Sequence, residues 1–127
     1  MKSDNIERQI ANILKVLGSA FRVKLLDSIG TGEACVCHLE AVMKKRQAYI
    51  SQHLMVLRDA GILETRRDGK YVFYRVADEG IFEVIESAAA IQGISPENLP
   101  KVTESVPHAD CACPNCVPEF AKEILSE

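Results

Sequence analysis

The sequence predicts a mainly α-helical domain that carries one β-hairpin, and three observations favour this fold class. Apolar residues recur at helical spacing through most of the first 60 residues. Over 62–67 and 71–76 the pattern becomes alternating and rich in β-branched and aromatic residues, around the turn sequence Asp68-Gly69-Lys70. Helical spacing then returns over residues 79–92. We therefore expect two strands in a hairpin, with helices before and after it.

Two helices are predicted within the first thirty residues. The first begins at a cap on Ser3 or Asp4 and runs to Leu17. Ser19 can cap the second helix, which runs to Ile29 before a glycine-rich break. Each helix carries one apolar stripe, and we expect both stripes to face the core.

Two further helices, Leu39–Lys45 and Ala48–Ala60, are separated by a polar break at Arg46-Gln47. The second ends at Gly61, the residue type best suited to a left-handed helix terminus. Its apolar stripe consists of Ile50, Leu54 and Leu57. Helix, turn, helix and hairpin is the order of a winged helix-turn-helix domain, whose second helix enters the major groove of DNA. The polar face lacks acids, and we predict DNA contacts through Gln47, Tyr49, Ser51, Gln52, His53 and Arg58.

The charge distribution supports a nucleic-acid contact in this part of the chain. The whole sequence has a net charge of −3, but residues 44–75 hold eight basic and three acidic side chains. This segment is therefore at +5 and the remainder at −8. The hairpin would carry Arg66, Arg67 and Lys70 outward, where they can contact phosphate or the minor groove.

The bulk composition indicates one soluble domain rather than a membrane protein. The 127 residues provide one hydrophobic core, and 47% hydrophobic with 26% charged residues is ordinary for a globular protein. No apolar run approaches the roughly 18 residues of a membrane span. Residues 1–4 lack the apolar segment of a signal peptide, so we expect a cytoplasmic protein with no membrane partner.

The last predicted helix favours a dimer. Asp78 can cap a helix from Glu79 to Gln92, whose apolar residues cover more than one face. A dimer would also supply the two-fold pair of DNA contacts that such domains use. We therefore expect residues 1–92 to form a DNA-binding and dimerisation domain. Residues 93–127 follow as a cysteine-containing tail with a proline-rich linker and a short helix over 120–125.

Five cysteines lie in two tight groups, which is typical of a thiolate ligand set or a redox centre rather than a disulfide framework. The tail group, Cys111, Cys113 and Cys116, places three thiols within six residues. Three thiolates suit As(III), Cd(II), Pb(II), Cu(I) or Zn(II), or part of an iron-sulfur cluster. His108 precedes this group and could act as a fourth ligand.

The other group, Cys35-Val36-Cys37, leaves two alternatives open. Residues two apart on an α-helix point about 200° apart, so both sulfurs cannot bind one ion within a regular helix. Either one of them serves, or the pair lies at a frayed helix start. A helix N-terminus would favour the thiolate form. We expect His38 to be a surface or capping residue.

Three separate motifs resemble the arsenic-repressor (ArsR/SmtB) family of winged-helix metal sensors. They are Glu33-Ala34-Cys35-Val36-Cys37-His38-Leu39, the helix and turn over residues 50–63, and the hairpin over residues 67–76. The resemblance implies a homodimeric repressor that releases its operator DNA when it binds a toxic or excess metal. It also implies that Cys35 and Cys37 belong to the inducer site. The last helix lacks histidine, so the resemblance does not extend to the zinc site of that family.

Together these patterns predict a repressor, not an enzyme, that senses a thiophilic metal or metalloid through Cys35, Cys37, Cys111, Cys113 and Cys116. As(III) is favoured, followed by Cd(II) or Pb(II). The alternative is a regulator that senses oxidants through disulfide formation or holds an iron-sulfur cluster. A thiol enzyme using Cys113 and Cys116 is disfavoured, because the strand-helix setting of a thioredoxin-like dithiol is missing from the sequence.

Overall fold

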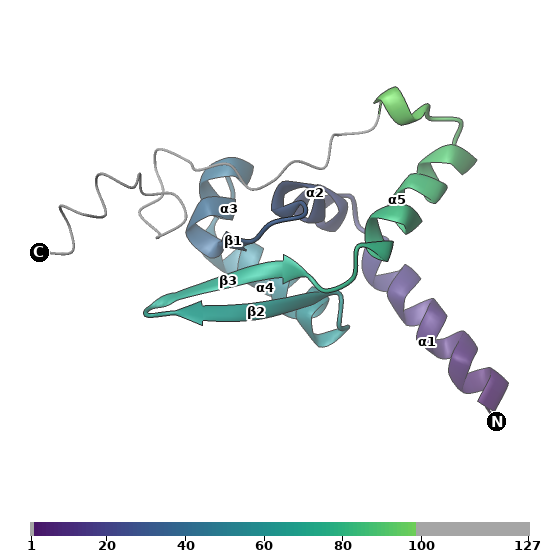
Figure 1. Cartoon of the computed structure of the whole chain (residues 1–127), viewed down its shortest axis with the longest axis horizontal. Helices are drawn as coiled ribbons and strands as arrows, with labels where there is room; N and C mark the ends of the chain where they lie inside the picture. Colours follow the sequence, from purple (N-terminus) through teal and green to yellow (C-terminus); the bar gives the residue numbers. More distant parts are fainter. Residues whose placement is uncertain (1, 99–127) are drawn as a thin grey trace, which may run out of the picture.

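The structure is a computed structural model that describes residues 2–98, and it consists of helices arranged around a small antiparallel sheet (Figure 1). Figure 1 shows the β2–β3 hairpin projecting at one end and helices α1 and α5 at the other. The predicted tail helix and the tail cysteines lie outside the described residues. The elements are α1 (Lys2–Leu17), α2 (Ala20–Ile29), β1 (Ala34–Cys35), α3 (Val36–Met43), α4 (Gln47–Asp59), β2 (Leu63–Asp68), β3 (Tyr71–Val76), α5 (Gly80–Ile91) and the 3₁₀ turn η1 (Pro96–Asn98).

The first two helices end where the sequence predicted, but α1 begins at Lys2, so Ser3 and Asp4 lie inside the helix and do not cap it. The expectation that its whole apolar stripe faces the core was also wrong, because Ile6, Ile10 and Leu14 are more than half exposed. Helix α1 ends at Leu17 and helix α2 ends at Ile29, as expected. Ser19 caps α2, with its hydroxyl oxygen accepting a hydrogen bond from the Arg22 N–H over 3.4 Å. This bond satisfies one of the free donors of the helix terminus.

Helix α3 begins three residues earlier than predicted, at Val36 instead of Leu39. Cys35 has extended backbone dihedrals and acts as the cap, with its sulfur accepting a hydrogen bond from the His38 N–H over 3.3 Å. The expectation for His38 was wrong, because this residue lies inside α3 and is only 4% exposed. The helix stops at Lys44, which adopts a left-handed conformation with φ of 55°.

Helix α4 ends as predicted in a motif that depends on glycine. Gly61 has φ of 79°, and its N–H donates to the Arg58 carbonyl over 2.9 Å. The Ile62 N–H reaches back to the Leu57 carbonyl over 3.0 Å. These two bonds are those of a Schellman motif. They direct the chain from the helix straight into β2.

The sheet has one strand more than the sequence predicted. The hairpin forms as expected, with Asp68 opposite Tyr71 and a two-residue loop whose Gly69 has φ of 60°. Positive φ at the first loop position is the arrangement of a type II′ turn. The additional strand is β1, which pairs antiparallel with β3, so the strand order is β1-β3-β2.

The core lies between α2, α3, α4 and the base of the hairpin. All three residues of the predicted α4 stripe, Ile50, Leu54 and Leu57, are fully buried. They pack with Leu25 and Leu39 and their neighbours in one cluster. Burying a side chain of this size contributes about 1.5–3 kcal/mol. The packing therefore fixes which face of α4 is presented to solvent.

The last described helix, α5, begins at Gly80, close to the predicted start. The Asp78 carboxylate accepts a hydrogen bond from the Gly80 N–H over 2.8 Å, which supports the predicted capping role. Among the described helices, none has the length and apolar character required to cross a bilayer.

Candidate functional site: a thiol pair beside a DNA-reading surface

The structure brings the two sulfurs of Cys35 and Cys37 to 2.9 Å from each other. The reason is local. Cys35 precedes α3 and has φ of −87° and ψ of 165°, whereas Cys37 lies in the first turn of the helix. The extended conformation removes the 200° divergence of a regular helix. Of the two alternatives that the sequence left open, the structure has the pair at a helix start.

The two thiols of this pair differ in their accessibility to solvent. Cys35 is 2% exposed, while Cys37 is half-buried and reachable from solvent. Both sulfurs lie at the N-terminus of α3. Cys35 also packs against Phe73 of β3, with Cys37 and Tyr71 at the edge of this cluster.

The pair supplies two donors of a thiophilic metal site. Two thiolates bound tetrahedrally to one ion at about 2.3 Å lie about 3.8 Å apart, so the sulfurs must separate by roughly 1 Å from their present 2.9 Å. Within residues 2–98 no group of three or more His, Cys, Asp or Glu side chains is placed to hold a metal ion. Further donors would therefore have to come from the tail or from another chain.

The solvent-facing side of α4 carries most of the predicted DNA contacts. Gln47, Gln52 and Arg58 are exposed, and Ser51 is half-buried. Met55 was not predicted but is 50% exposed, one turn from Gln52 on the same face. An apolar side chain in this position can contact a thymine methyl group. The sequence signal for Met55 was its position outside the Ile50, Leu54 and Leu57 stripe.

Tyr49 and His53 occupy a different position, because both contact α2. Their ring centroids lie 4.8 Å apart, and each lies 4.8 Å from the ring of Phe21. His53 Nδ1 also accepts a hydrogen bond from Arg22 Nε over 3.1 Å. A second bond joins Arg22 Nη1 to the Val16 carbonyl over 3.0 Å. These contacts hold α4 against α2 and the end of α1.

The surroundings of His53 favour its neutral form. Burial of the ring lowers its pKa below 6.5, and the neighbouring Arg22 charge lowers it further. A neutral ring with Nδ1 as acceptor carries its proton on Nε2. This nitrogen then remains a donor near the DNA-reading surface.

Three basic residues connect the two helices of the reading unit. Lys44, Lys45 and Arg46 lie between α3 and α4, and all three are exposed. Lys45 Nζ lies 6.0 Å from the centroid of the Tyr49 ring. Positive charge at this point adjoins the N-terminus of α4, a common location for phosphate contacts.

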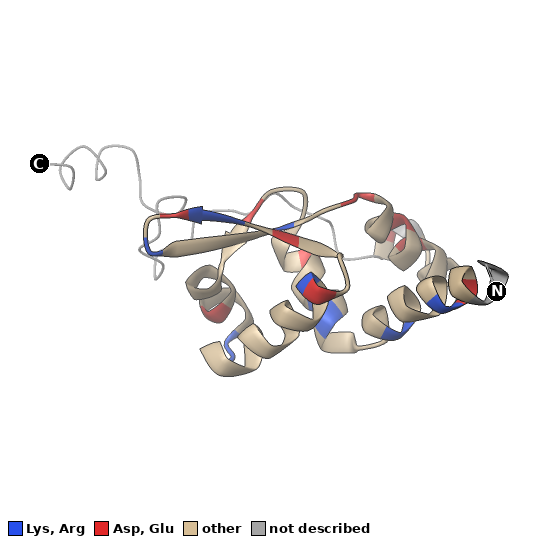
Figure 2. Cartoon of the chain, turned by 90° about the horizontal axis from the view of Figure 1, so that it is seen from below, with Lys and Arg blue, Asp and Glu red and all other residues tan. Residues whose placement is uncertain are grey.

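Half of the positive charge on the hairpin is offset by acids, and Figure 2 shows acidic and basic residues beside one another there. Arg66 forms a bidentate ion pair with Glu33, the residue before β1, which raises the Arg66 pKa. Arg75 also forms an ion pair, in which its Nε and Nη2 both contact Oε1 of Glu64. Arg66, which the sequence predicted to contact phosphate, therefore has a competing intramolecular partner in Glu33.

The tip of the hairpin keeps its charge. Arg67 is exposed and forms no ion pair with the described residues. Lys70 is also exposed, with its Nζ 5.5 Å from the centroid of the Tyr71 ring. These two side chains are the hairpin cations best placed for DNA phosphate.

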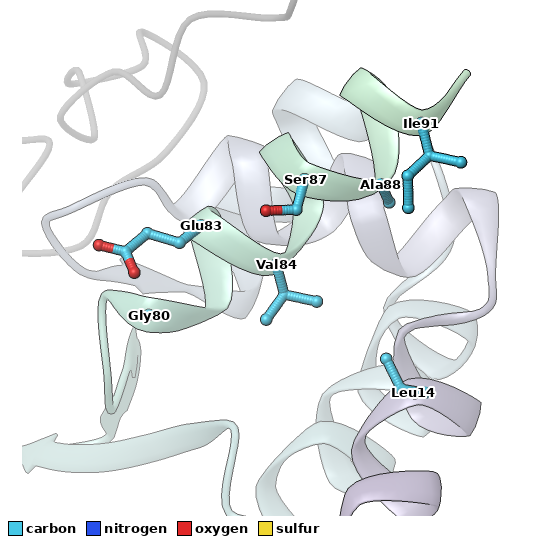
Figure 3. A pocket seen from close by; sticks show the side chains of 7 residues that line it. All are labelled: Leu14, Gly80, Glu83, Val84, Ser87, Ala88 and Ile91. Carbon is cyan, nitrogen blue, oxygen red and sulfur yellow. The ribbon is translucent and has the colours of Figure 1, made fainter. Parts of the chain in front are cut away.

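At the opposite end of the domain, α1 and α5 form an exposed apolar surface around a hollow of about 440 Å³ (Figure 3). Leu14 of α1 points toward the side of α5 that carries Val84 and Ile91, while Glu83 points away. Leu14 is 55% and Ile91 85% exposed. The same surface continues along α1 through Ile6 and Ile10.

The sequence of the domain matches a known protein family. The profile described as "Bacterial regulatory protein, arsR family" matches residues 21–65, which span α2 to the start of β2. A biofilm growth-associated repressor of Agrobacterium fabrum is 42% identical over 91 residues, covering 72% of this chain and 78% of that protein. A cadmium resistance regulatory protein homolog of Staphylococcus aureus is 34% identical over 80 residues, covering 62% of this chain and 66% of that protein.

Solved structures show the same fold. The transcriptional repressor BigR of Xylella fastidiosa superposes with a TM-score of 0.59 at 34% identity, covering 72% of this chain and 96% of that one. A homodimeric winged helix-turn-helix domain of Mycobacterium bovis, described as a possible ArsR-family regulator, superposes with a TM-score of 0.64 at 24% identity. It covers 71% of this chain and 83% of that one. The chain belongs to the ArsR family of bacterial regulatory proteins, with the winged helix-turn-helix fold of a transcriptional regulator rather than an enzyme.

Proposed function

We propose that this regulator represses transcription as a homodimer on operator DNA and leaves the DNA when a thiophilic metal or metalloid binds Cys35 and Cys37. The observation that carries the proposal is the distance of 2.9 Å between the two sulfurs at the start of α3. This helix leads through a three-residue basic turn into α4, which carries the DNA-reading surface. Metal binding at the start of α3 can therefore affect α4, the next helix along the chain.

The DNA contacts follow from which side chains remain available. Gln47, Ser51 and Gln52 on α4 can donate to and accept from base edges, and His53 can donate through Nε2. Arg67 and Lys70 hold phosphate, and Arg58 does so by exchanging its exposed ion pair with Asp59 for the phosphate. Tyr49 contacts DNA from the edge of α4, while its ring packs against Phe21.

The homodimer forms through the apolar surface of α1 and α5. Exposed side chains such as Ile10, Leu14 and Ile91 would each remain in water in a monomer. The hollow between the helices can receive side chains of a second copy (Figure 3). The homodimeric neighbour from Mycobacterium bovis has the same fold. The DNA-reading surfaces of the two copies then contact successive major grooves.

The inducer takes its remaining donors from the tail cysteines, Cys111, Cys113 and Cys116. As(III) requires three sulfurs, so one tail cysteine completes its site, whereas Cd(II) and Pb(II) take three or four. We favour As(III) first and Cd(II) or Pb(II) next. One relative is named as a cadmium resistance regulator homolog, which supports a thiophilic ion.

An anaerobic titration tests this proposal. The reduced full chain is bound to a fluorescent duplex that it has selected from a random pool, and As(III) or Cd(II) is added. Sulfur-to-metal absorption in the ultraviolet and the anisotropy of the duplex are followed in the same cuvette. We expect both signals to saturate at the same stoichiometry. Saturating absorption with the duplex still bound would contradict the release mechanism.

Cysteine variants assign the ligands in the same titration. Cys35→Ser with Cys37→Ser should abolish metal-induced release but leave DNA affinity intact. The matched triple variant Cys111→Ser, Cys113→Ser and Cys116→Ser should weaken the response if the tail completes the site. A triple variant with an unchanged response would leave the thiol pair as a ligand but remove the tail from the mechanism.

The short sulfur-sulfur distance also favours a second candidate function, a disulfide switch. A disulfide bond is about 2.05 Å long, and the sulfurs are already 2.9 Å apart. Two thiols would lose two protons and two electrons to an added disulfide or diazene oxidant such as diamide, and that oxidant would be reduced. Peptide mass spectrometry would find a loss of about two hydrogens on the peptide that contains Cys35 and Cys37.

The two candidates predict different responses. A disulfide sensor releases DNA on oxidation and recovers on adding dithiothreitol, without any metal. A metal sensor releases DNA while all thiols remain reduced. An iron-sulfur centre would instead give a brown protein with broad visible absorption after anaerobic purification.

A further inference from the structure

Cys35, Phe73 and Arg66 lie in one row across the three-stranded sheet. Cys35 on β1 is the register partner of Phe73 on β3, and Phe73 is the register partner of Arg66 on β2. Directly opposed residues of antiparallel strands project from the same face of a sheet. The thiol pair is therefore built into the base of the same sheet that forms the hairpin.

Glu33, two residues before Cys35, is joined to this row by its contact with Arg66. Arg66 Nε donates a hydrogen bond to Glu33 Oε2 over 3.0 Å, and Arg66 Nη2 donates to Oε1. The guanidinium carbon lies 4.6 Å from the centroid of the Phe73 ring. Arg66 thus crosses β3 to bind the segment that precedes β1.

The thiol pair packs against the same aromatic ring. Phe73 is 1% exposed and packs with Cys35 in a buried cluster, with Cys37 at its edge. Close packing means that a Cys35 side chain that moves must displace either the ring or its own strand. Both displacements reach Arg66, one through the ring and the other through Glu33.

We propose that Glu33 and Arg66 couple the thiol pair to the hairpin, so that a ligand on Cys35 and Cys37 changes the position of the hairpin tip. Arg66 is then a positioning residue that acts through Phe73 and Glu33 instead of contacting phosphate. This inference rests on the proposed function, because it assumes that the thiol pair is the inducer site. It adds a route through the sheet to the route from α3 to α4.

The ion pair suits coupling better than stabilisation. The Arg66 and Glu33 side chains are 49% and 25% exposed, and ion pairs that reach solvent in this way contribute little to stability. The β2–β3 ladder holds the hairpin together independently, through six residue pairs from Leu63↔Val76 to Asp68↔Tyr71. Removing the ion pair should therefore leave the fold, the thiol pair and the hairpin intact. It should remove only the coupling between the thiol pair and the hairpin.

Glu33→Gln tests the coupling, and Glu64→Gln is its matched control. Both substitutions remove one negative charge beside the sheet and break one arginine ion pair. Glu64 pairs with Arg75, which lies outside the row that contains Cys35. Both full-length variants and the unaltered protein are titrated anaerobically with Cd(II) alone. The Cd–thiolate absorption is compared with amide NMR shifts of residues 66–70.

In the unaltered protein we expect the hairpin shifts to saturate together with the absorption. Glu33→Gln should keep the absorption but reduce the hairpin shifts about fivefold or more, while Glu64→Gln should behave like the unaltered protein. Equal hairpin shifts in Glu33→Gln and the unaltered protein would overturn the coupling. So would absorption that saturates in the unaltered protein without any hairpin shift.

Operator binding separates this inference from the function on which it rests. Without Cd(II), Glu33→Gln should bind DNA with the affinity of the unaltered protein. The loss of DNA affinity that Cd(II) causes should be at least about fivefold smaller in Glu33→Gln than in the unaltered protein. Glu33-dependent hairpin shifts with no release of DNA in any variant would support the coupling and refute the metal-induced release. Failure of Cd–thiolate absorption to develop would refute both.

Discussion

Arg22 donates a hydrogen bond from Nε to Nδ1 of His53 over 3.1 Å, and this bond joins α2 to the DNA-reading helix α4. The same guanidinium also binds the Val16 carbonyl at the end of α1. One side chain thus connects the helix that we propose for dimerisation with the helix that we propose for DNA contact. Without Arg22, the His53 Nδ1 and the Val16 carbonyl would lose hydrogen bonds to water on folding without a replacement.

Arg22→Met should therefore lower the free energy of unfolding by about 1–2 kcal/mol, because two hydrogen bonds from a charged donor are lost while the apolar stem is kept. Urea unfolding at fixed protein concentration measures the change. Lys24→Met on the same helix is the control, since Lys24 is exposed, and it should stay within about 0.5 kcal/mol of the unaltered protein. Equal losses in both variants would show that the Arg22 bonds do not hold α4.

The neutral state of His53 predicts a pH dependence of stability. Its pKa in the folded protein is lowered by burial and by Arg22 from the ordinary value of 6.5. Between the two pKa values the unfolded chain binds more protons than the folded one. The free energy of unfolding should therefore fall as pH decreases from about 6.5 toward the folded-state pKa.

Urea unfolding at about pH 7.5 and about pH 5.5 measures this slope. His53→Asn keeps an acceptor near Arg22 and cannot titrate, so the loss of stability on acidification should be smaller in this variant. A slope that His53→Asn leaves unchanged would assign the pH dependence to other groups.

Gly61→Ala should destabilise the fold by about 1 kcal/mol through backbone strain alone. Gly61 has φ of 79°, and a Cβ at this position would meet no atom within 4 Å. The cost is therefore not a clash. Gly61→Asn should be less destabilising, because asparagine tolerates the left-handed conformation better. Thermal unfolding of the two variants tests the order, and an alanine variant as stable as the glycine original would contradict it.

The sequence was sufficient to predict the elements that have a period or a specific terminal residue. Helices α2 and α5, the hairpin and the end of α4 at Gly61 all follow from spacing, caps and turn chemistry. Strand β1 was missed because a strand of two residues has no detectable period. It exists through pairing with β3, and this pairing also moves the start of α3 to Val36.

The candidate site was predictable in its residue types but not in its connections. The cysteine spacing indicated a thiolate site, whereas the meeting of the two sulfurs depends on the backbone conformation of Cys35. Arg22 and His53 are 31 residues apart, and Glu33 and Arg66 are 33 apart. Pairs this distant have no local pattern in a single sequence, so only the folded chain identifies them.

The two cysteines of the pair should differ in reactivity. Cys35 is 2% exposed and its sulfur accepts the His38 N–H, whereas Cys37 is half-buried. Alkylation requires an accessible thiolate. Iodoacetamide should therefore label Cys37 several times faster than Cys35, as followed by peptide mass spectrometry of the reduced protein. Faster labelling of Cys35 would contradict the capped geometry.

The apolar surface of α1 and α5 predicts which substitutions give a monomer. Leu14→Glu and Ile91→Glu each place a charge on side chains that are 55% and 85% exposed in the single chain, so neither disturbs the core. In a dimer that buries this surface, an unpaired carboxylate costs several kcal/mol. Sedimentation equilibrium should find both variants monomeric but folded. Val42→Glu, on an exposed apolar residue of α3 outside this surface, should remain dimeric. Dimers of all three variants would show that the copies associate through a different surface.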